Sequence, residues 1–363
     1  MKQYDCVQQD RRVINGRRTG ERLAWALAVV CLLWTVGACS DQREGTQGRG
    51  AGTACDGGPC VREIALQAGL NEPRDPAEEF ADYLRFTELA ADHARPIPPK
   101  GLGKIIDRCL NGTLGSIAQR VDADQLRAVL LHELNIGFLV QGIEQRPLTV
   151  AASQPIEHPN YLERRLVFDD PFVGRFRALL LRPREAGPHS AIIARHGHRD
   201  DESTFVELYG GRRLAEAGFV VLVLQSRICG ADELEDRTAR LLLGNGFTLI
   251  GLRCYESLLA LRYLEQLQGV DNGRIGLVGH SGGSVVNNLT ARIDPRFKAV
   301  VIDCPGRWVN VINGRIVDET APGLYPYRKQ LNDFSSIPTQ TLVVPYGYAE
   351  QVEDMVEFLQ DEL

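Results

Sequence analysis

The chain has 363 residues, of which 44% are hydrophobic and 24% are charged, and its formal net charge at pH 7 is -6. This is the composition of an ordinary globular protein, and the length allows one large α/β domain and a smaller appendage. Because the net charge is negative, the chain offers no basic field for nucleic acid, and we expect no nucleic-acid partner.

The first 38 residues have the layout of an export signal. Five arginines precede an uncharged, mostly apolar run over residues 23–34, which is too short to span a bilayer comfortably. Small residues then lead to Cys39, and this ending resembles the lipobox of bacterial lipoproteins, where the signal is cleaved before a cysteine that becomes lipidated. The pattern predicts a signal peptide over residues 1–38, lipidation of Cys39, and a lipid-anchored protein on the periplasmic or extracellular face of the cell envelope. The alternative is an uncleaved anchor helix with an incidental cysteine.

Residues 39–60 predict a flexible tether, because they are rich in Gly, Gln, Arg and Asp and hold almost no large apolar side chain. Cys55 and Cys60 bracket a turn, and in an oxidising compartment we expect a local disulfide between them. A metal site at this pair is disfavoured, because no second cysteine pair follows nearby. We expect buried thiols at the four cysteines that follow in the chain, namely Cys109, Cys229, Cys254 and Cys304.

Residues 61–160 show helical patterns. Pro76 opens one segment, and Asp122 precedes another as a typical helix-capping residue. The apolar residues of the second segment share one face of a helix: Leu126, Leu130, Leu131 and Leu134. We expect a small helical region that packs against the main domain or shapes a binding cleft.

Residues 161–363 predict an α/β domain. Alternating apolar residues on either side of a turn near Gly174 indicate an antiparallel hairpin. Short apolar strands and amphipathic helices then alternate along the chain, which is typical of a mostly parallel sheet covered by helices on both faces. The expected strands are residues 191–194, 219–224, 275–278 and 299–302, and the expected helices are residues 208–217, 252–267 and 285–292.

The clearest functional motif is a serine between two glycines. Ser281 follows the apolar strand at residues 275–278, with Gly279 two residues before it and Gly283 two residues after it, and a helix follows. In a nucleophile elbow a sharp turn lifts the serine Oγ above the sheet, and small flanking residues let strand and helix approach. The pattern therefore predicts that Ser281 is a catalytic nucleophile; the alternative is a glycine-rich turn with no chemistry.

A second motif, at residues 196–198, follows the strand at residues 191–194. An oxyanion hole needs two backbone N–H groups that converge on the developing negative charge. We expect these donors from Gly282, which follows the nucleophile, and from the segment Gly197 to His198. The alternative is a loop whose histidines only end the strand.

From about residue 161 onward the chain resembles the dienelactone hydrolase and acetyl xylan esterase branch of the α/β-hydrolase superfamily. The resemblance rests on the turn at residues 196–198, on residues 214–222, on the long helix before residues 271–275, on the elbow at residues 279–283 and on residues 294–301. It implies an α/β-hydrolase fold and a Ser/His/acid hydrolase of small carboxylic esters that needs no cofactor or metal.

The general base departs from this family pattern. In the family the catalytic histidine follows the last strand, but no histidine follows His280 here, and Tyr348 stands where one is expected. Tyrosine titrates near pH 10 and is a poor base at neutral pH. Asp303, at the end of the strand after the elbow, is the candidate acid, and His198, on the loop facing the elbow, is the preferred substitute base. Other acidic candidates are Asp318, Glu319 and Glu350.

Two rival functions remain open at this point. Residues 196–201 nearly match a zinc-ligand run of the metallo-β-lactamase type, so a zinc hydrolase using His196 and His198 is conceivable, but histidines for a complete site are lacking. Because the downstream histidine is absent, the chain could also be a degenerate hydrolase that serves as a binding lipoprotein of the cell envelope. A dinucleotide site is excluded, because the glycine spacing around Gly279 does not match its fingerprint.

Overall fold

The structure is a computed structural model that describes residues 61–67, 74–114, 118–230, 232–304, 311–312, 315–344 and 348–363. All of them belong to one compact unit, Gly57–Leu363. The expected signal peptide, the lipidated Cys39, the whole tether, and the Cys55 and Cys60 pair lie outside the described residues. No helix of the described part is long and apolar enough to cross a membrane.

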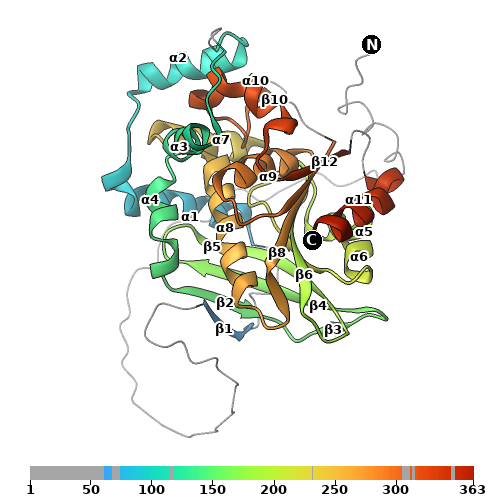
Figure 1. The fold of residues 1–363 in the computed structure, drawn as a ribbon. Coiled ribbons are helices and arrows are strands. Elements are labelled where there is room, and N and C mark those ends of the chain that lie inside the picture. Colours follow the sequence, from blue (N-terminus) through green and yellow to red (C-terminus); the bar gives the residue numbers. More distant parts are fainter. Residues whose placement is uncertain are drawn as a thin grey trace, which may run out of the picture. The chain divides into compact units, whose positions relative to one another are not determined.

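A mixed sheet forms the centre of this unit (Figure 1). Along one path its strands follow the order β1-β2-β4-β5-β7-β6-β8-β9-β12, and β3 pairs with β4 at the side. The strands are β1 (Val61–Ala65), β2 (Leu148–Ala152), β3 (Ile156–Glu157), β4 (Tyr161–Asp170), β5 (Gly174–Pro183), β6 (His189–Arg195), β7 (Val220–Leu224), β8 (Val270–His280), β9 (Ala299–Asp303) and β12 (Gln340–Val344). A separate two-stranded ribbon joins β10 (Val311–Ile312) and β11 (Arg315–Ile316).

The strands from β7 to β12 in this order are mutually parallel, whereas β4 and β5 form the expected antiparallel hairpin. The hairpin turn is held by Asp170, whose carboxylate accepts the N–H groups of Phe172 and Val173 at 2.9 Å, and by Gly174 at φ +73°. The expected α/β architecture with a mostly parallel sheet is therefore confirmed.

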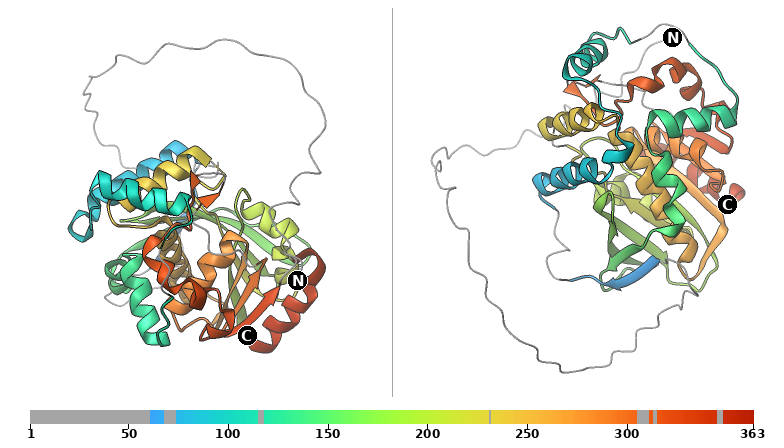
Figure 2. Two further views of the ribbon diagram at one scale, coloured as in Figure 1. Left: turned by 90° about the horizontal axis from the view of Figure 1, so that it is seen from above. Right: turned by 90° about the vertical axis from the view of Figure 1, so that its left-hand side faces the viewer.

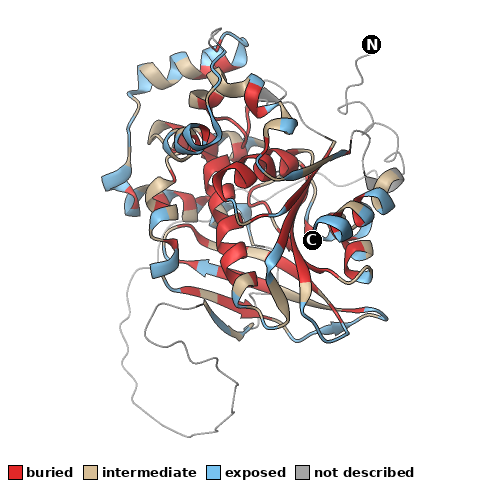
Figure 3. Ribbon diagram, viewed as in Figure 1, coloured by how far each residue is buried: buried red, intermediate tan, exposed pale blue. Residues whose placement is uncertain are grey.

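Helices cover both faces of the sheet (Figures 1 and 2). On one face α8 and α9 pack against Leu222 and Leu277, and on the other α5, α6 and α11 pack against Val221 and Val278. The helices are α1 (Pro76–Leu89), α2 (Pro99–Leu110), α3 (Ala123–Glu133), α4 (Gly137–Gln141), α5 (Glu202–Leu208), α6 (Gly211–Glu216), α7 (Asp232–Gly244), α8 (Leu249–Gln266), α9 (Gly282–Ile293), α10 (Arg328–Leu331) and α11 (Tyr348–Glu362). Burial is greatest in the central strands and in α8 and α9 (Figure 3).

Residues 61–160 are not only helical. Helices α1 to α4 occur there, and Asp122 caps α3 through a capping box with Gln125, so that Leu126 and Leu130 are fully buried. However, β1 and β2 from the same segment extend the central sheet, since β2 pairs antiparallel with β4. The segment thus shares one sheet and one core with the rest of the unit, which the helical patterns did not predict.

The expected buried thiols are found only in part. Cys109 and Cys254 are buried, whereas Cys229 and Cys304 are partly exposed. The two exposed thiols follow β7 and β9, where loops leave the carboxyl edge of the sheet. Loops at this edge are less completely covered than the strands that precede them.

A buried ion-pair network joins β6, α8 and the loop after β7. The carboxylate of Glu256 on α8 contacts Arg227 at 3.0 Å and 2.5 Å and Arg195 at 3.4 Å, and all three side chains are at most 1% exposed. Removing one partner of such a group leaves the other charges without compensation in a medium of low polarity. Glu256 therefore connects the end of β6 with the loop after β7, and the loops around the elbow begin there.

We predict that Glu256→Ala lowers the free energy of unfolding by about 3–5 kcal/mol, because two buried guanidinium groups lose their carboxylate. Glu207→Ala is the matched control, since Glu207 pairs with Arg212 on the surface, where both side chains are about half exposed. Its loss should cost less than about 1 kcal/mol. Urea denaturation measures both, and equal losses would show that the network contributes little.

Candidate functional site

Backbone strain gathers at the carboxyl edge of the parallel strands. Four residues other than glycine have positive φ there: Arg199 after β6, Ile228 after β7, Ser281 after β8 and Cys304 after β9. Such conformations cost roughly 1–3 kcal/mol each and occur preferentially at functional sites. In open α/β sheets, ligands also bind beyond the carboxyl ends of the strands. Both observations place the candidate site at this edge.

Ser281 occupies a sharp turn between β8 and α9, with φ 49° and ψ -113°. A Cβ atom added to Gly279 would lie 2.5 Å from the carbonyl oxygen of Gly283, and one added to Gly283 would lie 2.3 Å from that of Arg195. Real Cβ atoms do not come this close to backbone atoms, so both positions require glycine. The N–H of Ser281 donates to the carbonyl of Asp303 at 3.0 Å, which ties the turn to β9.

The loop after β6 lies directly against this turn. A Cβ atom added to Gly197 would lie 3.2 Å from the Cβ of Ser281, and one added to Gly282 would lie 2.9 Å from Nδ1 of His198. The structure thus brings together the serine, the residue after it and the two residues expected to supply a second backbone N–H group.

Asp303 has a partner that the sequence reasoning missed. Its buried carboxylate hydrogen bonds to Nδ1 of His280, and the ring of His280 stacks on Tyr209 with centroids 3.8 Å apart. The family pattern places the catalytic histidine after the nucleophile, so the sequence does not indicate His280 as the partner of Asp303. The parallel register that sets His280 opposite Asp303 could have signalled the pair, because both residues end neighbouring strands.

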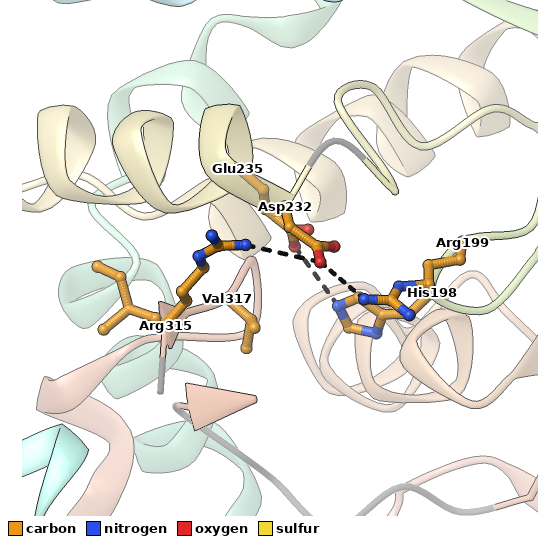
Figure 4. A pocket seen from close by; sticks show the side chains of 7 residues that line it. His198, Arg199, Asp232, Glu235, Arg315 and Val317 are labelled. Carbon is orange, nitrogen blue, oxygen red and sulfur yellow. Dashed lines mark hydrogen bonds and ion pairs between the residues drawn. The ribbon is translucent and has the colours of Figure 1, made fainter. Parts of the chain in front are cut away.

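His198 lies in a different electrostatic environment (Figure 4). Its Nε2 is 2.6 Å from Asp318 and 3.4 Å from Glu235, and its Nδ1 is 3.4 Å from Glu319. Burial by itself lowers the pKa of His198, but the attraction of Glu319 and Glu235 outweighs this and raises the pKa to about 9. The structure therefore surrounds His198 with carboxylates and pairs Asp303 with another imidazole, so the three residues Ser281, His198 and Asp303 do not form one relay.

His196 is fixed in the core. Its Nε2 accepts the N–H of Ser226 at 3.0 Å, which leaves Nδ1 to donate to the carbonyl of Gly197 at 2.8 Å. Burial lowers the pKa of His196 to about 4, so its ring is neutral at physiological pH. Since both nitrogens are engaged, His196 has no free position for a metal, and a zinc site built on His196 and His198 is not favoured.

A pocket of about 50 Å³ opens beside His198, between α7 and the segment after β11 (Figure 4). Asp232 and Glu235 of α7 point into it, and Arg315 pairs with Asp232 at its rim at 3.7 Å. Of the remaining sequence candidates, Tyr348 begins α11, but its side chain and that of Glu350 lie outside the described part.

The comparisons with known proteins agree with this architecture. No protein-family model matches the chain. A protein of Bacillus subtilis (strain 168) named as a hydrolase, YtaP, is 25% identical over 221 residues, which cover 56% of this chain and 72% of the relative. A structure from Bacteroides fragilis NCTC 9343 named as an acetyl xylan esterase has a TM-score of 0.51 at 15% identity, over 74% of this chain and 80% of its own. Strand order and this likeness together establish the α/β-hydrolase fold.

The geometry of the turn makes a stability prediction. Gly279→Ala and Gly283→Ala should each lower the free energy of unfolding by about 2–3 kcal/mol or more, because a Cβ would overlap backbone atoms that cannot move independently. Gly103→Ala on α2 is the control, since nothing lies within 4 Å of its added Cβ and alanine should raise stability by up to about 1 kcal/mol. Thermal and urea unfolding measure all three, and an elbow variant as stable as the wild type would contradict the proposed crossing of β8 and α9.

Proposed function

We propose that the protein is a serine hydrolase of small carboxylic esters with Ser281 as the nucleophile. The observation that carries this proposal is the backbone of Ser281, which combines a positive φ with glycine-dependent contacts on both sides. A strained strand-to-helix turn exposes the Oγ of a serine above the sheet, where it can attack a carbonyl carbon. The fold of the chain supports the same chemistry.

The proposed oxyanion donors are backbone N–H groups. Gly282 supplies one donor, as the residue after the nucleophile, and the segment from Gly197 to His198 supplies the other. When Oγ attacks the ester carbonyl, the carbonyl oxygen becomes an oxyanion that accepts both hydrogen bonds. Departure of the alcohol leaves an acyl group on Ser281, which water then hydrolyses to the acid. The donors contribute most at the tetrahedral steps, because negative charge develops there.

For the proton acceptor we assign the pair His280 and Asp303 and keep Asp303 as the acid. Two imidazoles flank the elbow, and only His280 has Asp303 as its partner. The Cδ2 atom of His280 and the Cβ of Ser281 lie 3.0 Å and 3.2 Å from the position that a Cβ of Gly197 would occupy, so both side chains border Gly197. In this arrangement Asp303 orients the ring and stabilises the imidazolium that forms. His198, which the sequence predicted as the base, is not assigned that role and lies beside the proposed oxyanion donors.

The substrate class rests on resemblance. The motifs at residues 196–198 and 279–283 resemble the dienelactone hydrolase and acetyl xylan esterase branch, and a protein named as an acetyl xylan esterase shares the fold. We therefore propose a short acyl ester as substrate. A degenerate binding lipoprotein is not favoured, because the elbow geometry and a His–Asp pair are both present beside the serine.

Turnover of p-nitrophenyl acetate tests the proposal. Ser281→Ala and His280→Gln should each lower kcat by about a thousandfold or more, because the nucleophile or the base is lost while the oxyanion donors remain. His158→Gln is the control and should retain wild-type kcat, since the His158 ring stacks on Tyr161 and its Nε2 lies 3.2 Å from Glu163, both on β4.

The outcomes separate the two parts of the proposal. Wild-type turnover no faster than that of Ser281→Ala would contradict the hydrolase function. Full activity in His280→Gln, with loss in Ser281→Ala, would contradict only the assignment of the base.

We further propose that the protein is a lipid-anchored protein of the cell envelope, on the basis of the lipobox-like sequence that ends at Cys39. Cys39→Ser should accumulate as a precursor that retains residues 1–38, because the signal peptidase of lipoproteins requires the cysteine. Intact mass and incorporation of labelled palmitate measure this, with Cys55→Ser as the control that is still processed. A wild-type protein free of lipid in the soluble fraction would contradict the anchor.

A further inference from the structure

The carboxylate cluster around His198 is assembled from three separate segments. His198 lies on the loop after β6, Glu235 on α7, and Asp318 and Glu319 on the turn that follows β11. One possible ligand atom from each of His198, Asp318 and Glu319 lies within 4.8 Å of the others. The three carboxylates are at most 5% exposed and the imidazole is 20% exposed. Buried carboxylates that lie this close together repel one another, so the cluster needs positive charge to compensate them.

The cluster contains buried polar atoms that lack hydrogen bonds within the described residues. These atoms are Nε2 of His198, Oδ1 of Asp318 and Oε2 of Glu319. The first two are 2.6 Å apart, yet they are not aligned as a hydrogen bond. Because buried polar atoms are almost always hydrogen-bonded, three exceptions within one cluster point to a bound ion. The side chain of Glu319 is 3% exposed, and its contact with Nδ1 of His198 is made through its other oxygen, Oε1, at 3.4 Å.

The charges of the cluster point to a cation. Arg253 pairs with Oδ2 of Asp318, the oxygen that does not contact His198, and its side chain is buried. The nearby Arg199 and Arg315 instead contact Asp232, at 2.7 Å and 3.7 Å. The cluster holds three buried carboxylates. Arg253 and a protonated His198 would together supply only two positive charges to compensate them. An uncompensated buried carboxylate is costly, and a divalent cation would remove the imbalance.

We propose that His198, Asp318 and Glu319 bind one divalent transition-metal ion, with the carboxylate of Glu235 beside them. An imidazole nitrogen together with carboxylate oxygens suits Zn²⁺ and its neighbours, whereas Mg²⁺ and Ca²⁺ prefer oxygen ligands alone. His198 and Glu235 of this cluster also line the pocket described above (Figure 4). This site differs from one built on His196, whose ring nitrogens are already engaged.

The cluster lies beside the proposed catalytic elbow. Nδ1 of His198 and Oε1 of Glu319 are 2.9 Å and 3.1 Å from the position that a Cβ of Gly282 would occupy. A divalent charge at this place would stabilise negative charge that develops near the N–H of Gly282. Metal binding nevertheless stands apart from the proposed hydrolase function and does not require it.

Zinc content tests the site directly. The full-length protein, purified without a histidine tag, is stripped with a chelator, incubated with Zn²⁺, desalted and measured by mass spectrometry of the metal. We expect close to one Zn²⁺ per chain for the wild type and for Ser281→Ala. Glu319→Gln should bind at least about a hundredfold more weakly, since even outer-sphere partners of metal ligands cost about 10–100-fold. Asp232→Asn, at the rim of the same pocket, is the matched control and should retain the ion.

X-ray absorption at the zinc edge identifies the ligands. A shell of nitrogen and oxygen at about 2.0–2.2 Å without sulfur is expected, whereas sulfur at about 2.3 Å would place the ion on cysteines and overturn the proposal. Less than a tenth of an equivalent of zinc in folded wild-type protein, or equal binding by Glu319→Gln and wild type, would also overturn it. Thermal melting confirms that Glu319→Gln is folded; if it is not, Glu319→Asp, which keeps the charge but shortens the side chain, replaces it and should also lose affinity.

Discussion

The close crossing of β8 and α9 is the constraint on which the rest of the site depends. Gly279 and Gly283 allow the strand and the helix to approach until a single Cβ would collide with backbone, and Ser281 between them is forced to a φ of 49°. This strain is held in place by the parallel sheet, since the N–H of Ser281 donates to the carbonyl of Asp303 on the neighbouring strand. The rigid sheet and the lack of a Cβ at Gly279 and Gly283 thus determine the direction of the Ser281 side chain.

The imidazoles of His280 and His198 both lie beside the elbow, but they have different carboxylate partners. His280 pairs with Asp303 and stacks on Tyr209, which fixes its ring. His198 faces three acidic side chains from α7 and from the turn after β11, an arrangement better suited to holding a positive charge than to accepting a proton. We therefore infer proton transfer on one side of Ser281 and charge stabilisation on the other.

The sequence predicted the fold well where local patterns are strong. The apolar strands, the capping of α3 by Asp122 and the elbow at Ser281 all depend on neighbouring residues and were found as expected. Strands β1 and β2 were missed, because short strands near helical patterns gain their stability from pairing with distant segments. The same limit applies to the site: the partners of Asp303 and His198 come from other strands and turns, and sequence spacing does not report such contacts.

The central claim is that Ser281 is an activated nucleophile, and covalent labelling tests it most directly. A fluorophosphonate reacts only with a serine whose hydroxyl is activated, and peptide mass spectrometry then locates the adduct. The account predicts one adduct per folded chain, on the peptide that contains Ser281, and none after heat denaturation. An unlabelled folded protein, or an adduct on another residue, would contradict the account.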